Sequence, residues 1–343
     1  MIHPFPIRTR QPPGKAIVEA GGSIAEIQPP SSTTHSRELS LRPNGQLLNH
    51  FGYKFQVILV DNGSSDGSAE AIRTAYPHVT LIEIGTNLGF AEGNNVGIRA
   101  ALNTDAEFIL LLNNDTVVDP NLLAAFRSKF NAHPELSILG AKLYQHALPD
   151  TLDHWGGCWN SKTARFDLIG LAEKNPKYPS HLDYVCGAAL IARRSAWETV
   201  GLLEARFFLI WEEADWCMRA QKHGLKIAAC NEAIVWHKGS ASFRSKAHST
   251  YFWWRNRLLW IERNCDRNEI VRLYIRLLLP EIAHLLKIYL LKKGQLAIRK
   301  KLAPTRCFKN QEEKQRKTRA ALQGIFDYAR RRFGNAPTWI YEI

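Results

Sequence analysis

Residues 107–120 read EFILLLNNDTVVDP, and this stretch combines a buried strand with a polar end. Five apolar residues, Phe108 to Leu112, run directly into Asn113, Asn114 and Asp115. An apolar run of this length is typical of a strand that is buried on both faces, as in a parallel sheet. Amide and carboxylate groups at the end of such a strand are costly unless they meet water, a ligand or an ion. The stretch therefore predicts a central strand that leads to a binding site.

Strands and helices alternate on both sides of this stretch. Apolar runs predict strands at 55–61, 79–84 and 226–237, and helical patterns with capping or turn residues predict helices at 68–76, 87–102, 120–132 and 212–224. The connections between these segments are short. Alternation of this kind is typical of the α/β class, with a mostly parallel sheet flanked by helices.

Composition and charge divide the chain of 343 residues into three parts. Residues 1–53 are rich in Pro, Ser and Gly, which predicts a poorly ordered, low-complexity segment. Residues 54–245 hold the alternating pattern, and 246–343 carry apolar residues at helical spacing between basic ones. Residues 1–237 have a net charge of −3 and 238–343 one of +16, so an anionic surface is the expected partner of the C-terminal region.

The cysteines and the longest apolar runs indicate in which compartment the protein is found. Six cysteines are scattered without a C-x-x-C pair, which predicts neither a zinc site nor a disulfide framework and favours a reducing cytosol. The N-terminus lacks the apolar core of a signal peptide, and no uncharged apolar run reaches the roughly 18 residues needed to span a bilayer. We therefore expect a cytoplasmic protein.

Two carboxylates follow strands of the predicted sheet. Asp61 ends the run VILVD, and Asp115 follows FILLL. Ligands of open α/β sheets gather beyond the carboxyl ends of the strands, so both side chains are expected at one rim. Taken separately, Asp61-Asn62-Gly63 has the composition of an ordinary turn, and 113–115 that of a helix cap ahead of Pro120. Their occurrence on two strands of one sheet favours a site.

A second group of polar residues occurs near residue 213 and at His237. Glu212, Glu213 and Asp215 begin a predicted helix, where the helix dipole favours negative charge. Three acids in four positions exceed what a cap requires, and like charges this close raise the pKa of at least one, which suits a general base. His237 ends the apolar run IVWH; a lone histidine is more often structural, but its place at a strand end also fits a ligand.

With these residues assembled, the sequence resembles the nucleotide-sugar-dependent glycosyltransferases of family 2, and most of all the bacterial rhamnosyltransferase-like members that build cell-surface polysaccharides. The resemblance covers about residues 55–245. It is carried by VILVDNGSSDGS, NLGFAEGNNVGI, LLLNNDTVVDP, VCGAALIARRSAWETVGLLEARFFLIWEEADWCMRAQKHG and VWHKGSAS, which occur in the family's order.

The resemblance implies a GT-A fold and a role for each candidate residue. Asp61 would contact the base and ribose of a dTDP- or UDP-sugar, with Asn87 and Gly89 in the loop beside it. Asn113, Asn114 and Asp115 would replace the family's Asp-x-Asp. Asp115 would hold Mg²⁺ or Mn²⁺ against the diphosphate, and His237 would be a second protein ligand near the metal. Glu213 falls where the family has its general base, Asp215 would be its helix-side partner, and the choice between Glu212 and Glu213 stays open.

One feature departs from the family. Its members begin with an apolar strand that lies in the middle of the sheet and lines the nucleotide pocket. Residues 1–50 are expected to contain no such strand, since KAIVEA (15–20) is short and polar. A vacant central position would leave unpaired backbone groups and exposed apolar surface. A catalytically inactive remnant or binding protein is therefore the alternative to an active enzyme.

The C-terminal region suggests the setting of the reaction. The aromatic residues of YFWWRNRLLWIERN (251–264) are expected to pack against the catalytic domain. Residues 268–301 predict amphipathic helices with Arg and Lys flanks, which suit a peripheral contact with the inner face of the cell membrane. Nucleic acid would use the same charges, but no recognisable binding module accompanies them. The expectation is an inverting, metal-dependent enzyme acting on a cell-surface glycan or lipid-linked acceptor, with rhamnose as one candidate sugar.

Overall fold

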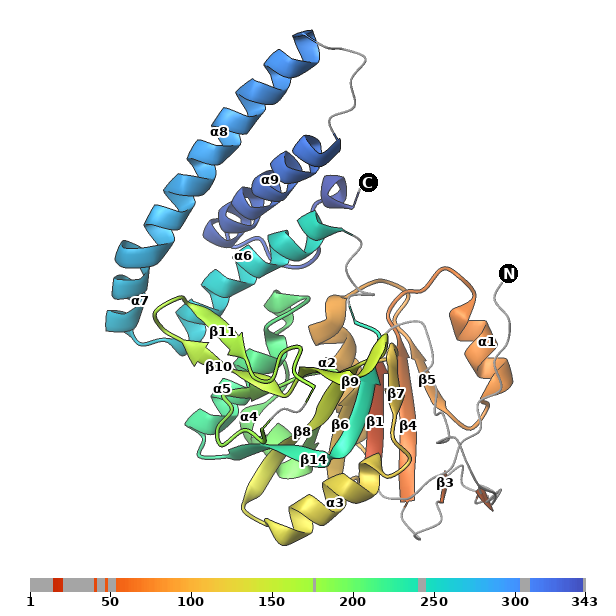
Figure 1. Cartoon of the computed structure of the whole chain (residues 1–343). Helices are drawn as coiled ribbons and strands as arrows, with labels where there is room; N and C mark the ends of the chain where they lie inside the picture. The colour runs from red at the N-terminus through yellow and green to blue at the C-terminus, as the bar shows by residue number, and fades with distance from the viewer. Residues whose placement is uncertain are drawn as a thin grey trace.

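The computed structural model describes residues 15–20, 40–41, 47–48, 54–174, 177–239, 245–302 and 309–341. A large sheet with helices on both faces forms one part of the molecule, and C-terminal helices extend from it (Figure 1). The predicted poor order of residues 1–53 lies outside the described residues, apart from three short strands within that segment.

The large sheet is parallel in one half and mixed in the other. In spatial order its main strands are β5 (Thr80–Glu83), β4 (Lys54–Asp61), β1 (Lys15–Ala20), β6 (Phe108–Leu112), β13 (Ala189–Arg193), β8 (Leu136–Gln145), β14 (Lys226–His237) and β7 (Thr116–Val118). The first four run parallel, β13 is antiparallel to both of its neighbours, and β14 is parallel to β8. Three short strands lie outside this order: β2 (Ser40–Leu41), β3 (Leu47–Leu48) and β9 (Leu148–His154), the last paired with β8.

The expectation that residues 1–50 lack the central strand is wrong. Strand β1 lies between β4 and β6 and pairs in parallel with both, Val18 standing opposite Ile58 on one side and Leu111 on the other. A central strand has to satisfy the backbone groups of two neighbours, and six residues suffice where each ladder is only four or five pairs long. The short length and polar composition of KAIVEA therefore do not prevent it from forming the central strand.

Strand β6 is buried on both faces, as its sequence predicts. Ile109 and Leu111 belong to the core on one side of the sheet, and Phe108, Leu110 and Leu112 to the core on the other side. Helix α2 (Gly89–Leu102) covers the first side through Ile98, and α3 (Leu122–Ala132) covers the second through Phe126 and Phe130. Alternation of side chains along a strand produces this two-sided burial.

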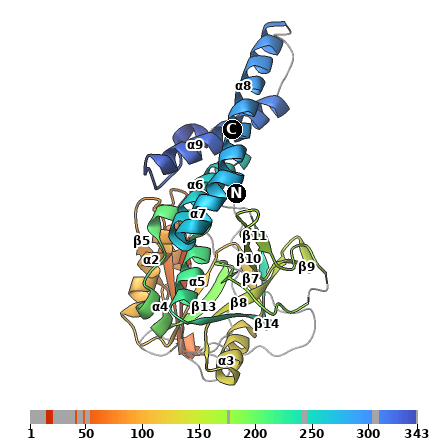
Figure 2. The same cartoon turned by 90° about the vertical axis from the view of Figure 1, so that its left-hand side faces the viewer.

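Other helices and a small sheet complete the unit that holds the site. The helices are α1 (Ser68–Ala75), α4 (Arg194–Val200), the 3₁₀ turn Ala205–Phe207 and α5 (Glu212–Lys222). The small sheet consists of β11 (Arg165–Leu168), β10 (Gly156–Asn160) and β12 (Tyr184–Val185), all antiparallel. In Figure 2 the β10–β11 hairpin lies between the large sheet and the C-terminal helices.

The C-terminal helices are α6 (Lys246–Asn264), α7 (Arg267–Leu273), a π-helical turn (Tyr274–Leu278), α8 (Leu279–Leu302), α9 (Lys309–Ala329) and a 3₁₀ turn (Thr338–Ile340). Helix α6 is largely buried. Its Trp260 packs against Trp159 and Phe166 and its Phe252 against Phe208, which confirms the predicted packing on the catalytic domain for these two residues, whereas Tyr251 contacts Asp327 of α9. Helix α8 projects away from the sheet (Figures 1 and 2). Within the described part of the chain, no helix is both long and apolar enough to cross a bilayer.

The predicted fold class is confirmed: a GT-A-like α/β arrangement whose sheet is flanked by helices, followed by a basic helical appendage. Its antiparallel pairings lie at β13, at the β7 and β9 edges, and where the short strands β2 and β3 pair beside β4.

Candidate active site

Asp61 is the last residue of β4, at the carboxyl end of the parallel strands. Its side chain is buried, and both carboxylate oxygens accept hydrogen bonds from the Ser64 backbone N–H, at 3.2 and 3.3 Å. This is the geometry of a turn stabilised by an Asp side chain. The turn keeps the carboxylate at the rim of the sheet.

The side chain of Asn62 joins the loop after β4 to the loop before α2. Its Nδ2 donates to Asn87 Oδ1 at 3.3 Å and to the Gly89 carbonyl oxygen at 2.9 Å, while its Oδ1 accepts from the Leu88 N–H at 2.8 Å. Gly89 has φ +81°, and a Cβ there would lie 2.4 Å from the carbonyl oxygen of Phe208. Asn87 and Gly89 therefore hold the two loops together at the rim that carries Asp61.

Asp115 follows β6 and contacts His237, the last residue of β14. The antiparallel pairing of β14 with β7 sets His237 opposite Thr116, next to Asp115 in the chain. Asp115 Oδ1 lies 3.3 Å from His237 Nε2 without the alignment of a hydrogen bond, and Asp153 Oδ2 lies 3.1 Å from Nδ1 on the other side of the ring. The imidazole therefore lies between two carboxylates.

The two carboxylates control the charge of His237. Burial alone would lower the pKa of His237, but the contacts with Asp115 and Asp153 outweigh it and raise the pKa to about 9. The same interactions hold the pKa of Asp115 below its ordinary value, against the effect of its burial. In the metal-free protein at neutral pH, the three side chains form an anion–cation–anion group.

This group predicts a pH dependence of stability. Because the folded protein holds the His237 proton more tightly than the unfolded chain does, the stabilisation is fully present below about pH 6.5 and is lost as the pH rises through about 9. The difference corresponds to roughly 3 kcal/mol of unfolding free energy. Urea unfolding in the presence of a chelator, at about pH 6 and about pH 9.5, measures it. The His237→Gln variant should show a clearly smaller decrease, and an equal decrease would contradict the assignment.

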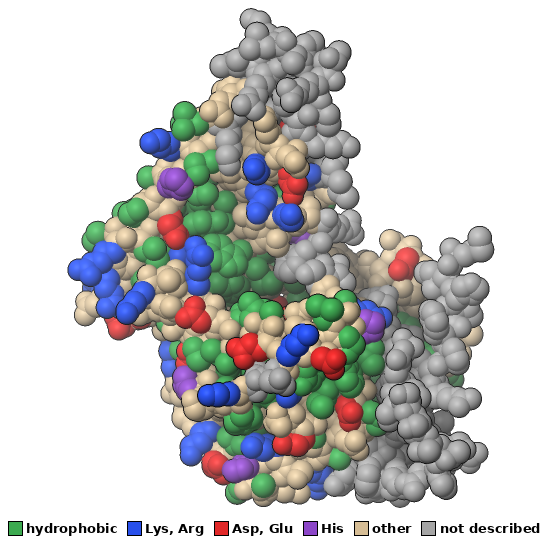
Figure 3. All heavy atoms as spheres, in the orientation of Figure 1, with side chains coloured by type: hydrophobic (Ala, Val, Ile, Leu, Met, Phe, Trp, Pro, Cys, Tyr) green, Lys and Arg blue, Asp and Glu red, His purple; other side chains and the backbone are tan. Residues whose placement is uncertain are grey.

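Glu213 faces a cavity of about 940 Å³ that lies between the sheet unit and the C-terminal helices. We call it the Glu213 cavity and define it by its lining residues Asp153, His154, Arg165, Phe166, Leu168, Tyr184, Ile210, Trp211, Glu213, Ala214, His237, Gly239, Ser249, Thr250, Trp253, Trp254, Leu285, Lys317, Thr318 and Ala321. In Figure 3 hydrophobic side chains gather around a hollow at this junction. His237 and Glu213 therefore share one cavity, and Asp115 reaches it through its contact with His237.

The two consecutive glutamates differ in what they face. Glu213 lines the cavity, whereas Glu212 is buried and is not among the lining residues. Burial raises the pKa of Glu213 above that of an ordinary carboxyl, and burial followed by the Glu213 charge raises the pKa of Glu212 well above it. One oxygen of each carboxyl is buried without a hydrogen-bond partner among the described residues. The geometry favours Glu213 over Glu212 for contact with a ligand.

The loop before Glu212 has an unusual backbone that buried polar side chains hold in place. Phe208, Ile210 and Trp211 all have positive φ, between +64° and +79°, which is costly for residues other than glycine. Asn256 Nδ2, from α6, lies 2.7 to 2.9 Å from three carbonyl oxygens of 207–210. The neighbouring Arg255 donates to the Phe207 carbonyl at 2.8 Å. Helix α6 thus fixes the loop that positions the two glutamates.

Asp215 lies apart from the cavity. Its side chain is fully buried, and it accepts hydrogen bonds from Arg219 Nε at 2.9 Å, from Arg263 Nε at 2.7 Å and from Asn264 Nδ2 at 3.0 Å. Arg263 and Asn264 belong to α6, so Asp215 connects α5 to the C-terminal helices. The structure does not bring Asp215 to Glu213's side of the helix, and its role as a partner of the base stays a prediction.

The sequence patterns missed several residues that build the site. Asp153 lies on β9, within a stretch without clear periodicity, and only its position before His154 at the end of a strand could have drawn attention to it. Arg255 and Asn256 interrupt an apolar helical pattern. Buried polar residues inside such a pattern signal that they bind backbone groups.

Comparison with known proteins shows that the sequence is similar to those of sugar-transferring proteins. Residues 34–200 match the family model described as glycosyl transferase family 2. The low-salt glycan biosynthesis hexosyltransferase Agl10 of Haloferax volcanii is 26% identical over 215 residues, which cover 60% of this chain and 66% of the relative. The N-acetylglucosaminyl-diphospho-decaprenol L-rhamnosyltransferase of Mycobacterium tuberculosis is 27% identical over 251 residues, which cover 60% of this chain and 79% of the relative.

More distant similarities were also found. The dTDP-rhamnosyl transferase RfbF of Shigella flexneri is 22% identical over 171 residues, covering 50% of this chain and 55% of the relative. Among solved structures, the mannosyltransferase PcManGT of Pyrobaculum calidifontis aligns with a TM-score of 0.48 and 13% identity, covering 95% of this chain and 90% of that one.

Proposed function

We propose that this chain, whose residues 34–200 match the family model described as glycosyl transferase family 2, transfers a sugar from a nucleotide-sugar donor to an acceptor hydroxyl, with inversion and with the help of a divalent metal ion. One observation carries this proposal. Glu213 and His237 line the same cavity, and His237 in turn contacts Asp115. The proposed general base, Glu213, and the proposed metal ligand His237 thus line one cavity, and that cavity is large enough for a donor and an acceptor.

The donor side of the proposal rests on Asp115 and His237. Asp115 Oδ1 is buried without a hydrogen-bond partner among the described residues, and His237 Nε2 lies 3.3 Å from it. Both atoms would bind one Mg²⁺ or Mn²⁺ ion, which displaces the proton that His237 Nε2 carries in the metal-free protein. Such an ion, when bound, neutralises the charge that grows on a diphosphate leaving group. Asp153 on the other ring nitrogen would orient His237. With Asp61 and Asn113 at the same rim, the nucleotide would lie along the ends of β4, β1 and β6.

The acceptor side rests on Glu213. The carboxylate would take the proton of the acceptor hydroxyl as that oxygen attacks the anomeric carbon from the face opposite the leaving group. Burial raises the pKa of Glu213, which brings it closer to the pH of the cytosol and improves it as a base. Glu212 lies outside the cavity lining, so Glu213 is the assigned base.

Calorimetry with UDP and dTDP, each with and without Mn²⁺, tests the donor side. We expect binding that depends on the metal and that falls by at least about tenfold in Asp115→Ala, because removing a ligand of this kind weakens metal sites strongly. Asp119→Ala is the matched control: Asp119 lies on the other side of β7 from Asp115, and its Oδ1 accepts a hydrogen bond from the Asn121 N–H just before α3. Binding that is equally tight without metal, or equally tight in Asp115→Ala, would overturn the metal assignment.

The alternative of an inactive remnant or binding protein was motivated by a missing central strand. Strand β1 occupies that position, so this motive no longer applies. The test above still separates the alternatives, because the absence of any nucleotide binding by the intact protein would favour the inactive one.

For the sugar and the acceptor we propose only a chemical class, which the names of the relatives suggest. Two relatives are named for rhamnose transfer and one of them for a diphospho-decaprenol acceptor, so dTDP-rhamnose and a lipid-linked glycan are the first pair to assay. The aromatic side chains of Phe166, Trp211 and Trp253 line the cavity and are suited to packing against sugar rings or an isoprenoid chain. A cell-surface glycan is the proposed product class.

We place the enzyme at the inner membrane surface, in peripheral contact through the face of α7 and α8. Val271, Ile275, Leu279, Leu286 and Leu290 are each about half exposed or more, and their spacing of four or seven residues places them along one side of the helices. Exposed basic residues, Arg272, Arg276 and Lys287, lie between them, and in Figure 3 Lys and Arg side chains gather over α7. Apolar residues flanked by positive charge suit the headgroup region of an anionic bilayer.

Sedimentation with lipid vesicles tests this placement. The protein should bind vesicles of phosphatidylcholine and phosphatidylglycerol, and Ile275→Glu combined with Leu290→Glu should reduce the bound fraction at least about tenfold, because each change places a charge in the apolar contact. Leu148→Glu is the control, since Leu148 is equally exposed but lies on β9. Equal binding by the double variant and the control would refute the contact.

A further inference from the structure

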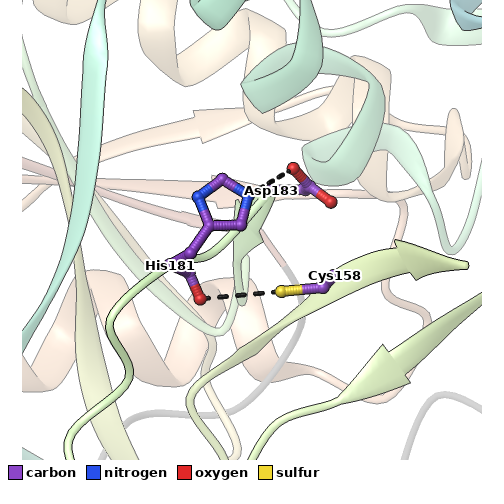
Figure 4. Close-up of side chains that lie close together, drawn as sticks. All are labelled: Cys158, His181 and Asp183. Atoms are coloured by element: carbon purple, nitrogen blue, oxygen red, sulfur yellow. Dashed lines mark hydrogen bonds and ion pairs between the residues drawn. The ribbon is translucent and has the colours of Figure 1, made fainter.

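Three potential metal ligands lie together on the small sheet, apart from Asp115 and His237. Cys158 belongs to β10, and His181 and Asp183 precede β12 (Figure 4). The Cys158 sulfur, a nitrogen of the His181 ring and a carboxylate oxygen of Asp183 all lie within 4.8 Å of one another. The three side chains are of different chemical types and come from two segments of the chain.

The backbone of the small sheet brings the three residues together. Strand β10 pairs antiparallel with β12, Gly157 opposite Tyr184, so the residues just before β12 run beside Cys158. The Asp183 N–H donates to the Gly157 carbonyl at 3.0 Å, and the Trp159 N–H donates to Asp183 Oδ2 at 2.6 Å. These two bonds fix the carboxylate and leave Oδ1 to contact His181 Nε2 at 2.9 Å.

The spacing is close to that of a tetrahedral metal site. Zinc bonds of roughly 2.0–2.3 Å at tetrahedral angles place the ligand atoms about 3.4–3.7 Å apart. The ligand atoms lie within 4.8 Å of one another, so the widest separation has to close by at most about 1.4 Å to reach this spacing. The His181 side chain is 65% exposed, so it can make that adjustment, and water can supply the fourth ligand.

We propose that Cys158, His181 and Asp183 bind one Zn²⁺ ion that fastens the β10–β11 hairpin to the segment before β12. Thiolate and imidazole ligands select zinc over Mg²⁺ and Mn²⁺, which prefer oxygen ligands. The hairpin supplies Arg165 and Phe166 to the Glu213 cavity, and the clamped segment leads to Tyr184 in the same cavity. Zinc would therefore stabilise one wall of the cavity. This proposal departs from the expectation that the cysteines form no zinc site, which rested on the absence of a C-x-x-C pair; here the ligands come from two separate segments.

Titration of the chelator-treated protein with Co²⁺ tests the site directly, since a thiolate ligand gives Co²⁺ a sulfur-to-metal charge-transfer band. We expect this band to saturate at one equivalent and to vanish when Zn²⁺ displaces the Co²⁺, whereas Mn²⁺ should not displace it. Cys158→Ser should lose the band. His181→Ala, a change at an exposed side chain that the fold tolerates, should weaken Co²⁺ binding at least about tenfold.

Matched controls make the assignment specific. Cys265→Ser and His223→Ala remove a half-buried cysteine and an exposed histidine elsewhere, and both should keep the band and its stoichiometry. Zn²⁺ should raise the melting temperature of the wild type and of both controls, but not that of His181→Ala. The absence of a band in the wild type, or its persistence in Cys158→Ser, would overturn the proposal. Asp115→Ala should leave the band unchanged, so this outcome is independent of the proposed sugar transfer.

Discussion

Glu213→Gln is expected to reduce the turnover number by about 10²–10⁴-fold, the usual contribution of a positioned general base. Gln keeps the size and hydrogen-bonding capacity of the side chain but cannot take up the acceptor proton. Metal-dependent nucleotide binding should remain within about threefold of the wild type, because Glu213 lies on the acceptor side of the proposed site. Initial rates with dTDP-rhamnose and a lipid-linked acceptor, together with calorimetry of the nucleotide, measure both quantities.

Glu212→Gln is the matched control for this change. It makes the same change, a carboxyl to an amide, at the adjacent position in the first turn of α5. Glu212 is buried outside the cavity lining, and its replacement should reduce turnover far less than that of Glu213. A reversed order of the two effects would assign the base to Glu212, and a loss below about tenfold in both would exclude a general base at this position.

The sequence predicted the sheet where each strand has its own pattern. Strand β6 is buried on both faces because α2 covers one face and α3 the other. Its five successive apolar residues, FILLL, indicate this burial in the sequence. Strand β1 was missed for the opposite reason. Its place between β4 and β6 is visible only in the backbone pairing with strands that follow it in the chain, and its own composition is not that of a buried strand.

The candidate site was predictable only at the strand ends. Asp115 and His237 were singled out because each follows an apolar run, and the structure brings them into contact. Asp153 contacts His237 because β9 pairs antiparallel with β8, and no pattern in the sequence of β9 predicts the register of that pairing. The choice between Glu212 and Glu213 required the fold too, since successive helical residues point about 100° apart and the sequence does not say which direction faces the cavity.

The contacts of α6 suggest a second role for Asp215, which the family resemblance makes the helix-side partner of the base. Its carboxylate is enclosed by Arg219 and Arg263, and Arg263 also pairs with Glu204 at 2.8 Å. Burying a carboxylate between two cations costs desolvation free energy. Removing the carboxylate afterwards costs more, because the two buried cations are then left without a counter-charge. These contacts predict a structural role that differs measurably from catalysis.

Asp215→Ala is expected to lower the free energy of unfolding by about 3–5 kcal/mol, the cost of breaking a buried ion pair from one side. Denaturant unfolding followed by intrinsic tryptophan fluorescence measures it, because Trp216 and Trp260 are buried in the core that joins α5 to α6. Glu198→Ala is the control: it removes an exposed partner of Arg194 at the same helical spacing and should cost no more than about 0.5 kcal/mol. The folded fraction of Asp215→Ala, assayed at low temperature, should keep turnover within about tenfold of the wild type. An unchanged unfolding midpoint combined with a loss as large as that of Glu213→Gln would instead make Asp215 part of the catalytic machinery, acting through α5 on the base beside it.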